Sequence, residues 1–188
     1  MQEARQITSH YLFSTEVRLE LETKTLALLD TGEGTRRYAY DASTGRRVHA
    51  PKGNLTIGRG LNLDVGLSDH EIEWLERNRL HHDISLFEVE VSSVEFQYAE
   101  PIRFSLLPDN VQIALALMVY QLGVTGTLGF HAILSCIARK QWHQAAIEAK
   151  NSKWFRETPK RVKIVIHLLT SINNTDKEIP RNIPTNEK

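Results

Sequence analysis

Internal disulfide bonding is excluded for this chain, because Cys136 is its one cysteine, and the absence of disulfides fits folding in a reducing compartment. Net charge is missing as well: 23 basic residues balance 23 acidic ones, so no global field steers the protein toward nucleic acid or an anionic membrane. No apolar run approaches the roughly 18 residues of a transmembrane helix, and the N-terminus lacks the basic-then-apolar pattern of a signal peptide. We therefore expect a soluble protein made in a cytoplasm, with no nucleic-acid partner and no stable membrane insertion.

The N-terminal third is predicted to hold a short strand, a short helix and a small sheet. Residues 17–22, VRLELE, alternate apolar and charged side chains with period two, which favours a strand. Residues 24–33, KTLALLDTGE, predict a helix with Thr23 as N-cap and Gly34 just after its C-terminus. Turn sequences between residues 35 and 63 separate short apolar stretches, the pattern of a small antiparallel sheet.

The remainder is predicted to be helical. Ser68 and Glu71 form a capping box at the start of a helix that we expect to connect two lobes. Residues 87–98 alternate like a strand, but their position after a helix favours its continuation. The sequence from Asp109, DNVQIALALMVYQLG, is apolar almost all round, as in a central core helix. Further helices are predicted in ILSCIARKQWHQAAIEAKNS and PKRVKIVIHLLTSI, and a disordered tail in NNTDKEIPRNIPTNEK.

Three motifs follow one another along the chain. The first combines Glu33-Gly34 with Tyr40-Asp41 and LTIGRG at 55–60; the second is MVYQLGVTGTLGF at 118–130, and the third is SKWFRETPKR at 152–161. Together they resemble the phage-type lysozymes, glycoside hydrolase family 24, over about residues 23 to 172. The resemblance implies an α+β, mostly helical, two-lobed fold, in which a long helix joins a small β-sheet lobe to a larger helical lobe and a cleft lies between the lobes.

This fold implies a division of the chain into five parts. We expect an N-terminal extension (1–22), a small α+β catalytic lobe (23–66), a connecting helix region (67–95), a helical C-terminal lobe (96–175) and a disordered tail (176–188).

Cleavage of a glycosidic bond needs a carboxylic acid that protonates the leaving oxygen and a second carboxylate on the opposite face of the sugar. Glu33, at a predicted helix C-terminus, is the candidate acid, because the helix dipole and partial burial there both disfavour the anion. Asp41, near several arginines, is the candidate for the ionised partner. The resemblance implies that Thr56 positions a water molecule. It also implies that the reaction inverts the anomeric centre.

Asp41 departs from the family's spacing. The family aspartate follows the tyrosine by two residues, where this chain has Ala42. In an extended strand a shift of one residue turns the side chain to the other face, unless a bulge restores its direction. Two interpretations of Asp41 therefore stay open, a second carboxylate or an ordinary turn residue, and Thr56 has the alternative of a simple strand former.

Other candidates for substrate contact come from the resemblance alone: Tyr40, Gly58, Leu61, Gln121, Phe130 and Arg161. It places Gln121 in the cleft and lets Arg161 reach toward Glu33, although both could instead bond to backbone and surface acids. We expect no metal and no cofactor, since His81, His82 and Asp83 are adjacent on a predicted helix and cannot face one ion. Core packing is the expected role of Trp142, Trp154 and Cys136.

The resulting hypothesis is a monomeric lysozyme that cleaves the β-1,4 bond between N-acetylmuramic acid and N-acetylglucosamine, its partner being the peptidoglycan glycan strand. As a phage endolysin it would stay in the host cytoplasm until its release to the cell wall. Basic residues of the catalytic lobe would meet carboxylates of that polymer: Arg36, Arg37, Arg46, Arg47, Lys52 and Arg59. The alternatives are a secreted antibacterial effector that uses residues 1–22 as an adaptor, and a non-catalytic peptidoglycan-binding relative.

Overall fold

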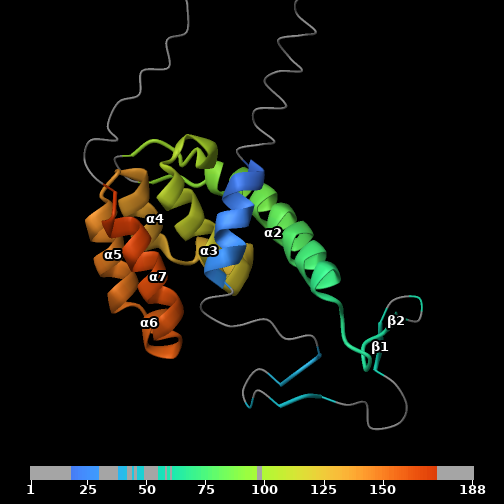
Figure 1. Cartoon of the computed structure of the whole chain (residues 1–188). Helices are drawn as coiled ribbons and strands as arrows, with labels where there is room; N and C mark the ends of the chain where they lie inside the picture. Colours follow the sequence, from blue (N-terminus) through green and yellow to red (C-terminus); the bar gives the residue numbers. More distant parts are fainter. Residues whose placement is uncertain are drawn as a thin grey trace, which may run out of the picture. The chain divides into compact units, whose positions relative to one another are not determined.

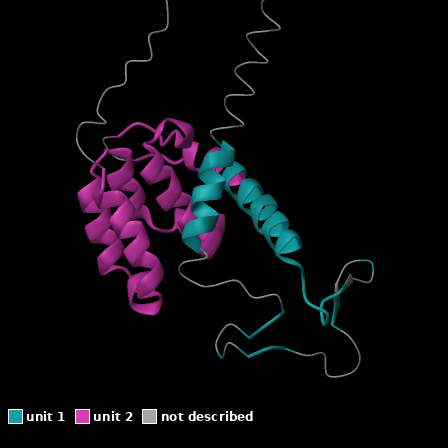
Figure 2. Ribbon diagram, in the orientation of Figure 1, with its two compact units in different colours: residues 1–85 teal, residues 86–188 magenta. Residues whose placement is uncertain are grey.

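The computed structural model describes residues 18–29, 38–41, 44, 46–48, 55–57, 59, 61–96 and 99–172. The chain divides into two compact units, residues 1–85 and 86–188 (Figure 2). A helix over residues 18–29 comes first. The elements that follow it are β1 (Thr56–Ile57), β2 (Leu61–Asn62), α2 (Asp69–Ser92), a 3-10 helix η1 (Phe104–Leu106), α3 (Asp109–Leu128), α4 (His131–Ala138), α5 (Trp142–Asn151), α6 (Lys153–Glu157) and α7 (Pro159–Thr170) (Figure 1). The described chain is thus mostly helical, as predicted.

The strand predicted at residues 17–22 is wrong, because residues 18–22 belong to the helix over residues 18–29. Its buried positions include Leu21, Thr25 and Leu29, which recur at every fourth residue as on one face of a helix. The hydroxyl of Thr23 donates to the carbonyl of Leu19 at 2.7 Å, so Thr23 lies inside the helix and is not its N-cap. The predicted helix end at Glu33 and Gly34 lies outside the described residues.

Two short antiparallel pairings lie within the segment predicted to form a small sheet. β1 pairs with β2, with Thr56 opposite Asn62 and Ile57 opposite Leu61. A separate bridge joins Tyr40 to Arg47. A small β-sheet lobe over residues 35–63 remains a prediction.

The capping box at the start of α2 is confirmed. The amide of Ser68 donates to Glu71 Oε2 at 2.7 Å, and the amide of Glu71 donates to Ser68 Oγ at 3.3 Å. The helix continues to Ser92, which confirms the preference for helix over strand in the first half of residues 87–98. Its fully buried side chains, spaced three or four residues apart, are Leu80, Ile84, Phe87 and Val91.

The core of the second unit surrounds α3, which packs against α7, while α5 packs against both α4 and α7. The side chains of Leu115, Leu117 and Met118 on α3 are at most 1% exposed, so the predicted core helix is confirmed. We expected no apolar run as long as a membrane span. This expectation is wrong, because the helix Asp109–Leu128 is long and apolar enough to cross a membrane when only its length and composition are considered. However, 61% of the apolar window is buried inside the protein, which is what a core helix shows.

The two C-terminal helical predictions are confirmed, with one break. Lys140 has φ of 57°, a left-handed conformation that ends α4 and separates it from α5. Trp154 and Cys136 are each 4% exposed and belong to the core, whereas Trp142 is half-buried.

Candidate functional site

Asp41 stands at the entrance of a tight turn. Its amide donates to the carbonyl of Arg46 at 2.9 Å, and the amide of Val48 donates to the carbonyl of Ala39 at the same distance. Asp41 Oδ1 accepts the amide of Thr44 at 3.0 Å, the local side-chain bond that aspartate forms in turns. The side chain is exposed, and its direction is therefore set by a turn rather than by the pleat of a strand.

Thr56 lies on the β1–β2 hairpin, which Asp64 closes. The amide of Leu55 donates to Asp64 Oδ2 at 2.9 Å, and the amide of Leu63 donates to the carbonyl of Leu55 at 2.7 Å. Thr56 is exposed in β1, and Leu61 is the first residue of β2. The hairpin thus presents Thr56 at its surface.

Arg47 joins the turn of Asp41 to the hairpin of Thr56. Its backbone pairs with Tyr40 across the turn, and its guanidinium carbon lies 3.9 Å from the centroid of the Tyr38 ring. The same guanidinium donates through Nη2 to the backbone carbonyl of Asp64. A planar guanidinium can stack on an aromatic ring and donate at its edge at the same time. The sequence identified Arg47 only as one positive charge of a cluster and missed this connection.

Gln121 and Gly123 form an irregular site on α3 in the second unit. Gly123 has φ of 71° and ψ of 170°, which interrupts the helix. Two residues earlier, Gln121 is half-buried, and its Oε1 is a buried oxygen that accepts no hydrogen bond within the described part of the chain. A buried acceptor without a donor costs free energy, so a hydroxyl or amide of a ligand would stabilise this position.

Phe130 brings the second and third sequence motifs together. Its ring meets that of Trp154 edge to face, with the centroids 5.8 Å apart and an interplanar angle of 62°. The same residue lines an open cavity of about 300 Å³ at the ends of α4 and α5. Arg161, in the first turn of α7, is half-buried, and its amide donates to the carbonyl of Thr158 at 3.1 Å. Both motifs therefore contribute to one packed region of the helical unit.

Comparison with known proteins decides the family. No family model matches the chain. It is 32% identical over 135 residues to "Probable T4-type lysozyme 2" of Dictyostelium discoideum. The aligned region covers 61% of this chain and 79% of that protein. It is also 42% identical over 62 residues to "Probable T4-type lysozyme 1" of the same organism, covering 32% of this chain and 36% of the relative.

The chain belongs to the T4-type lysozyme family. It is accordingly an enzyme, a glycoside hydrolase of the lysozyme type. The recognition made from the three sequence motifs is confirmed.

The residues expected to carry the lysozyme reaction are placed in part. Asp41 and Thr56 lie in the first unit on the two segments that Arg47 connects. Glu33 and Gly58 lie outside the described residues, so their roles, and those of the other candidates, remain predictions. Tyr40 is 42% exposed beside Asp41, as a side chain that meets a sugar would need to be.

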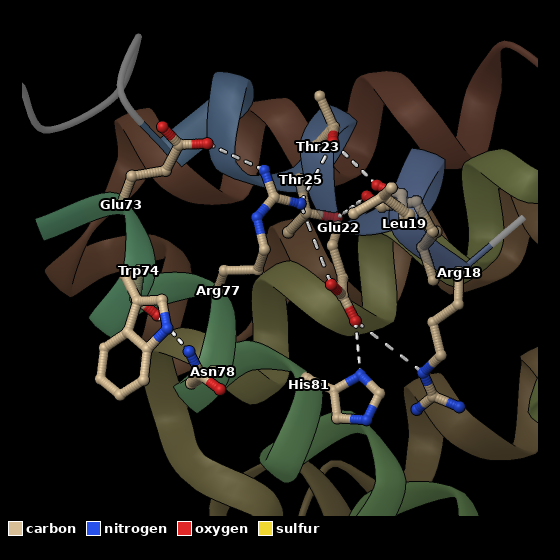
Figure 3. A network of polar contacts seen from close by, with 11 residues as sticks. Arg18, Leu19, Glu22, Thr23, Thr25, Glu73, Trp74, Arg77, Asn78 and His81 are labelled. Atoms are coloured by element: carbon tan, nitrogen blue, oxygen red, sulfur yellow. Dashed lines mark hydrogen bonds and ion pairs between the residues drawn. The ribbon is translucent and has the colours of Figure 1, made fainter. Parts of the chain in front are cut away.

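His81 and Asp83, two of the three neighbouring residues on α2 considered as metal ligands, contact other polar side chains. His81 Nδ1 is 2.8 Å from Oε1 of the buried Glu22 (Figure 3), and Asp83 pairs with Arg79 at 2.9 Å. Among the residues that the structure describes, no group of three or more His, Cys, Asp or Glu side chains could hold a metal ion. His81 and Asp83 therefore have structural partners within the first unit of this lysozyme-family chain.

Proposed function

We propose that this chain is a muramidase that hydrolyses the β-1,4 bond between N-acetylmuramic acid and N-acetylglucosamine in peptidoglycan, with inversion. Membership of the T4-type lysozyme family supports the activity. The observation that carries the mechanism is the connection of Asp41 and Thr56 through Arg47. It gives two of the predicted catalytic groups a common support in one small unit.

In the proposed reaction Glu33, as a neutral acid, protonates the glycosidic oxygen while the bond to the anomeric carbon breaks. Asp41 accepts a proton from a water that attacks the opposite face of the sugar, and Thr56 orients that water. An inverting enzyme needs the two carboxyl groups about 6.5 to 9.5 Å apart, so that the water fits between them. The buried Oε1 of Gln121 would accept a hydrogen bond from an acetamido or hydroxyl group of the glycan.

We further propose that the protein acts as a monomeric endolysin, held in the cytoplasm of a host until it reaches the wall. The absence of a possible internal disulfide supports that compartment. The two relatives come from Dictyostelium discoideum, which favours, as a second candidate, an antibacterial lysozyme that works outside phage infection. A holin gene beside this one would support the endolysin, and an immunity gene would support the secreted effector considered from the sequence. The presence of neither would favour the second candidate.

The activity is tested by measuring reducing ends released from purified peptidoglycan. Glu33→Gln should lower the rate about 10²- to 10⁴-fold, because an amide cannot deliver the proton. Glu20→Gln is the matched control, since Glu20 is an exposed glutamate on the helix that precedes Glu33. A folded Glu33→Gln protein with more than about half of the wild-type rate would exclude Glu33 as the acid.

Asp41 needs a test that separates its turn from its chemistry. Asparagine keeps an oxygen that can accept the amide of Thr44, whereas alanine removes both this cap and the charge. If Asp41 is the second carboxylate, Asp41→Asn and Asp41→Ala should be almost equally inactive, and Asp41→Glu should keep a trace of activity. Near-normal hydrolysis by Asp41→Asn, with a loss in Asp41→Ala alone, would show that Asp41 only caps its turn.

A further inference from the structure

The backbone of Leu55, the residue before Thr56, is held by two hydrogen bonds. Its carbonyl accepts the amide of Leu63 at 2.7 Å. Its amide donates to Oδ2 of Asp64 at 2.9 Å, in a partly buried contact. The first bond holds the peptide group that joins Leu55 to Thr56, and the second holds the peptide group before it. The placement of Thr56 therefore depends on the side chain of Asp64.

The Asp64 carboxylate takes a place that a backbone carbonyl holds in a regular sheet. The register of β1 and β2 (Figure 1) puts Leu55 opposite Leu63. Two residues in a hydrogen-bonded antiparallel pair exchange two backbone bonds. Here the amide of Leu63 makes one of them, whereas its carbonyl accepts the amide of Gly66 at 3.1 Å, and the amide of Leu55 bonds to Asp64. The Asp64 side chain thus completes the pairing of the two strands directly before Thr56.

The sequence after β2 directs the Asp64 side chain toward Leu55. Asn62 Oδ1 accepts the amide of Asp64 at 2.9 Å, which is the turn that asparagine forms with the residue two positions on. Gly66 has φ of 78°, a left-handed conformation that glycine adopts without steric cost, and its bond to Leu63 closes the turn. An ionised carboxylate also bonds an amide more strongly than a neutral acceptor does. The direction of this side chain is therefore built into residues 62–66.

We propose that Asp64 is a positioning residue for Thr56, an inference that rests on the proposed function. In that function Thr56 orients the water that attacks the sugar, and misplacement of a reacting group by 1 Å can cost about 10²-fold in rate. Asp64 is half-buried and Thr56 is exposed, so the carboxylate acts through the backbone and does not touch the glycan. The bond from Arg47 goes to the backbone carbonyl of Asp64, which every substitution of this residue keeps. The roles of Asp64 and Arg47 can therefore be tested separately.

The kinetic test compares two variants of Asp64, one that removes the bond and one that keeps it. Asp64→Ala should lower kcat for the release of reducing ends about tenfold or more and leave KM within about twofold, because it moves Thr56 and leaves the glycan contacts in place. Asp64→Asn, whose amide oxygen can accept from Leu55, should keep most of the activity. Asp83→Ala is the matched control and should match wild type, since Asp83 is also a half-buried aspartate of the first unit and pairs with Arg79. If Asp64→Ala does not fold, Asp64→Glu, which moves the carboxylate by one methylene, should show a loss in kcat alone.

A double-mutant cycle tests whether Asp64 acts through Thr56. Thr56→Val keeps the branched shape but lacks the hydroxyl, so it should itself lower kcat. In this background Asp64→Ala should lower kcat by less than about a further twofold, because the effects of two residues that serve one step are not additive. Losses that multiply would overturn the proposal. Equal impairment of Asp64→Asn and Asp64→Ala, or a folded Thr56→Val protein with the wild-type kcat, would overturn it as well.

Amide hydrogen exchange, measured by NMR, tests the contact without relying on activity. The amide of Leu55 should exchange about tenfold faster or more in Asp64→Ala than in wild type, because its acceptor is gone. The rate in Asp64→Asn should stay close to that of wild type, and Asp83→Ala should not change it. An unchanged rate in a folded Asp64→Ala protein would overturn the role of Asp64. An active Glu33→Gln protein would instead refute the proposed function, while the exchange of Leu55 would still decide whether Asp64 holds this peptide group.

Discussion

Replacement of Arg47 tests whether the segments that carry Asp41 and Thr56, the two candidate catalytic residues, depend on one side chain. The cation–π contact with Tyr38, at 3.9 Å, contributes about 0.5 to 1 kcal/mol at an exposed site. The bond to the carbonyl of Asp64 adds about 0.5 to 1.5 kcal/mol net. Because Arg47 is exposed, solvent screening favours the lower part of the sum, about 1 to 2 kcal/mol. Arg47→Ala should therefore lower the equilibrium constant for the connected arrangement about 5- to 30-fold.

The assay is kcat/KM for release of reducing ends, which should fall by up to the same factor. Arg46→Ala removes the same charge from the adjacent position, so it controls for the loss of attraction to an anionic polymer. Arg47→Lys keeps the charge but lacks the planar group that stacks on Tyr38, and should resemble Arg47→Ala more than wild type. Equal losses in Arg46→Ala and Arg47→Ala, with full activity in Arg47→Lys, would show that Arg47 contributes charge alone.

Two further predictions concern charge. The hydroxyl of Ser68, and to a smaller extent its amide, donate hydrogen bonds to the Glu71 carboxylate. Both bonds lower the pKa of Glu71 from its ordinary value of 4.5. A carboxyl whose pKa is lower in the folded protein adds stability that is fully present above its ordinary pKa and is lost as the pH falls through the folded value. In urea unfolding, Ser68→Ala should thus cost more stability at pH 7 than at pH 3, and an equal cost at both would refute the assignment. Separately, Arg46, Arg47 and Arg59 are exposed. The KM for peptidoglycan should therefore increase when the salt concentration is raised from about 20 to about 300 mM, because salt screens their attraction to the polymer's carboxylates. A KM that does not depend on salt would show that these arginines contact solvent and not the polymer.

The helices with a strong local pattern could be predicted from sequence. The capping box of Ser68 and Glu71 marks the start of α2, because its two reciprocal bonds are formed within four residues. The apolar run after Asp109 marks α3, because a helix that is hydrophobic all round must be buried. These signals are local, and tertiary contacts do not compete with them.

The segment at residues 18–22 shows where such reasoning fails. Alternation over six residues fits a strand, but Leu21 and Leu29 also recur with the period of a helix face, and the strand interpretation leaves Glu22 unexplained. Its partner His81 lies 59 residues away in sequence, so the reason for burying a carboxylate there cannot be derived from neighbours along the chain. The role of Arg47 was missed for the same reason, because its contact with Asp64 spans a sequence separation of 17.

The position of Asp41 changes the argument about the second carboxylate. Its displacement by one residue from the family spacing counted against it only on the assumption of an extended strand, where alternate side chains face opposite ways. The structure places Tyr40 in the bridge and Asp41 at the start of the turn, with Oδ1 fixed by the amide of Thr44. In a turn, that bond determines where the carboxylate points, and the pleat does not. A turn residue and a catalytic carboxylate are then compatible roles, since the bond to the Thr44 amide orients the side chain and uses only one of its two oxygens. The comparison of Asp41→Asn with Asp41→Ala separates them, because only the charge distinguishes the chemistry from the cap.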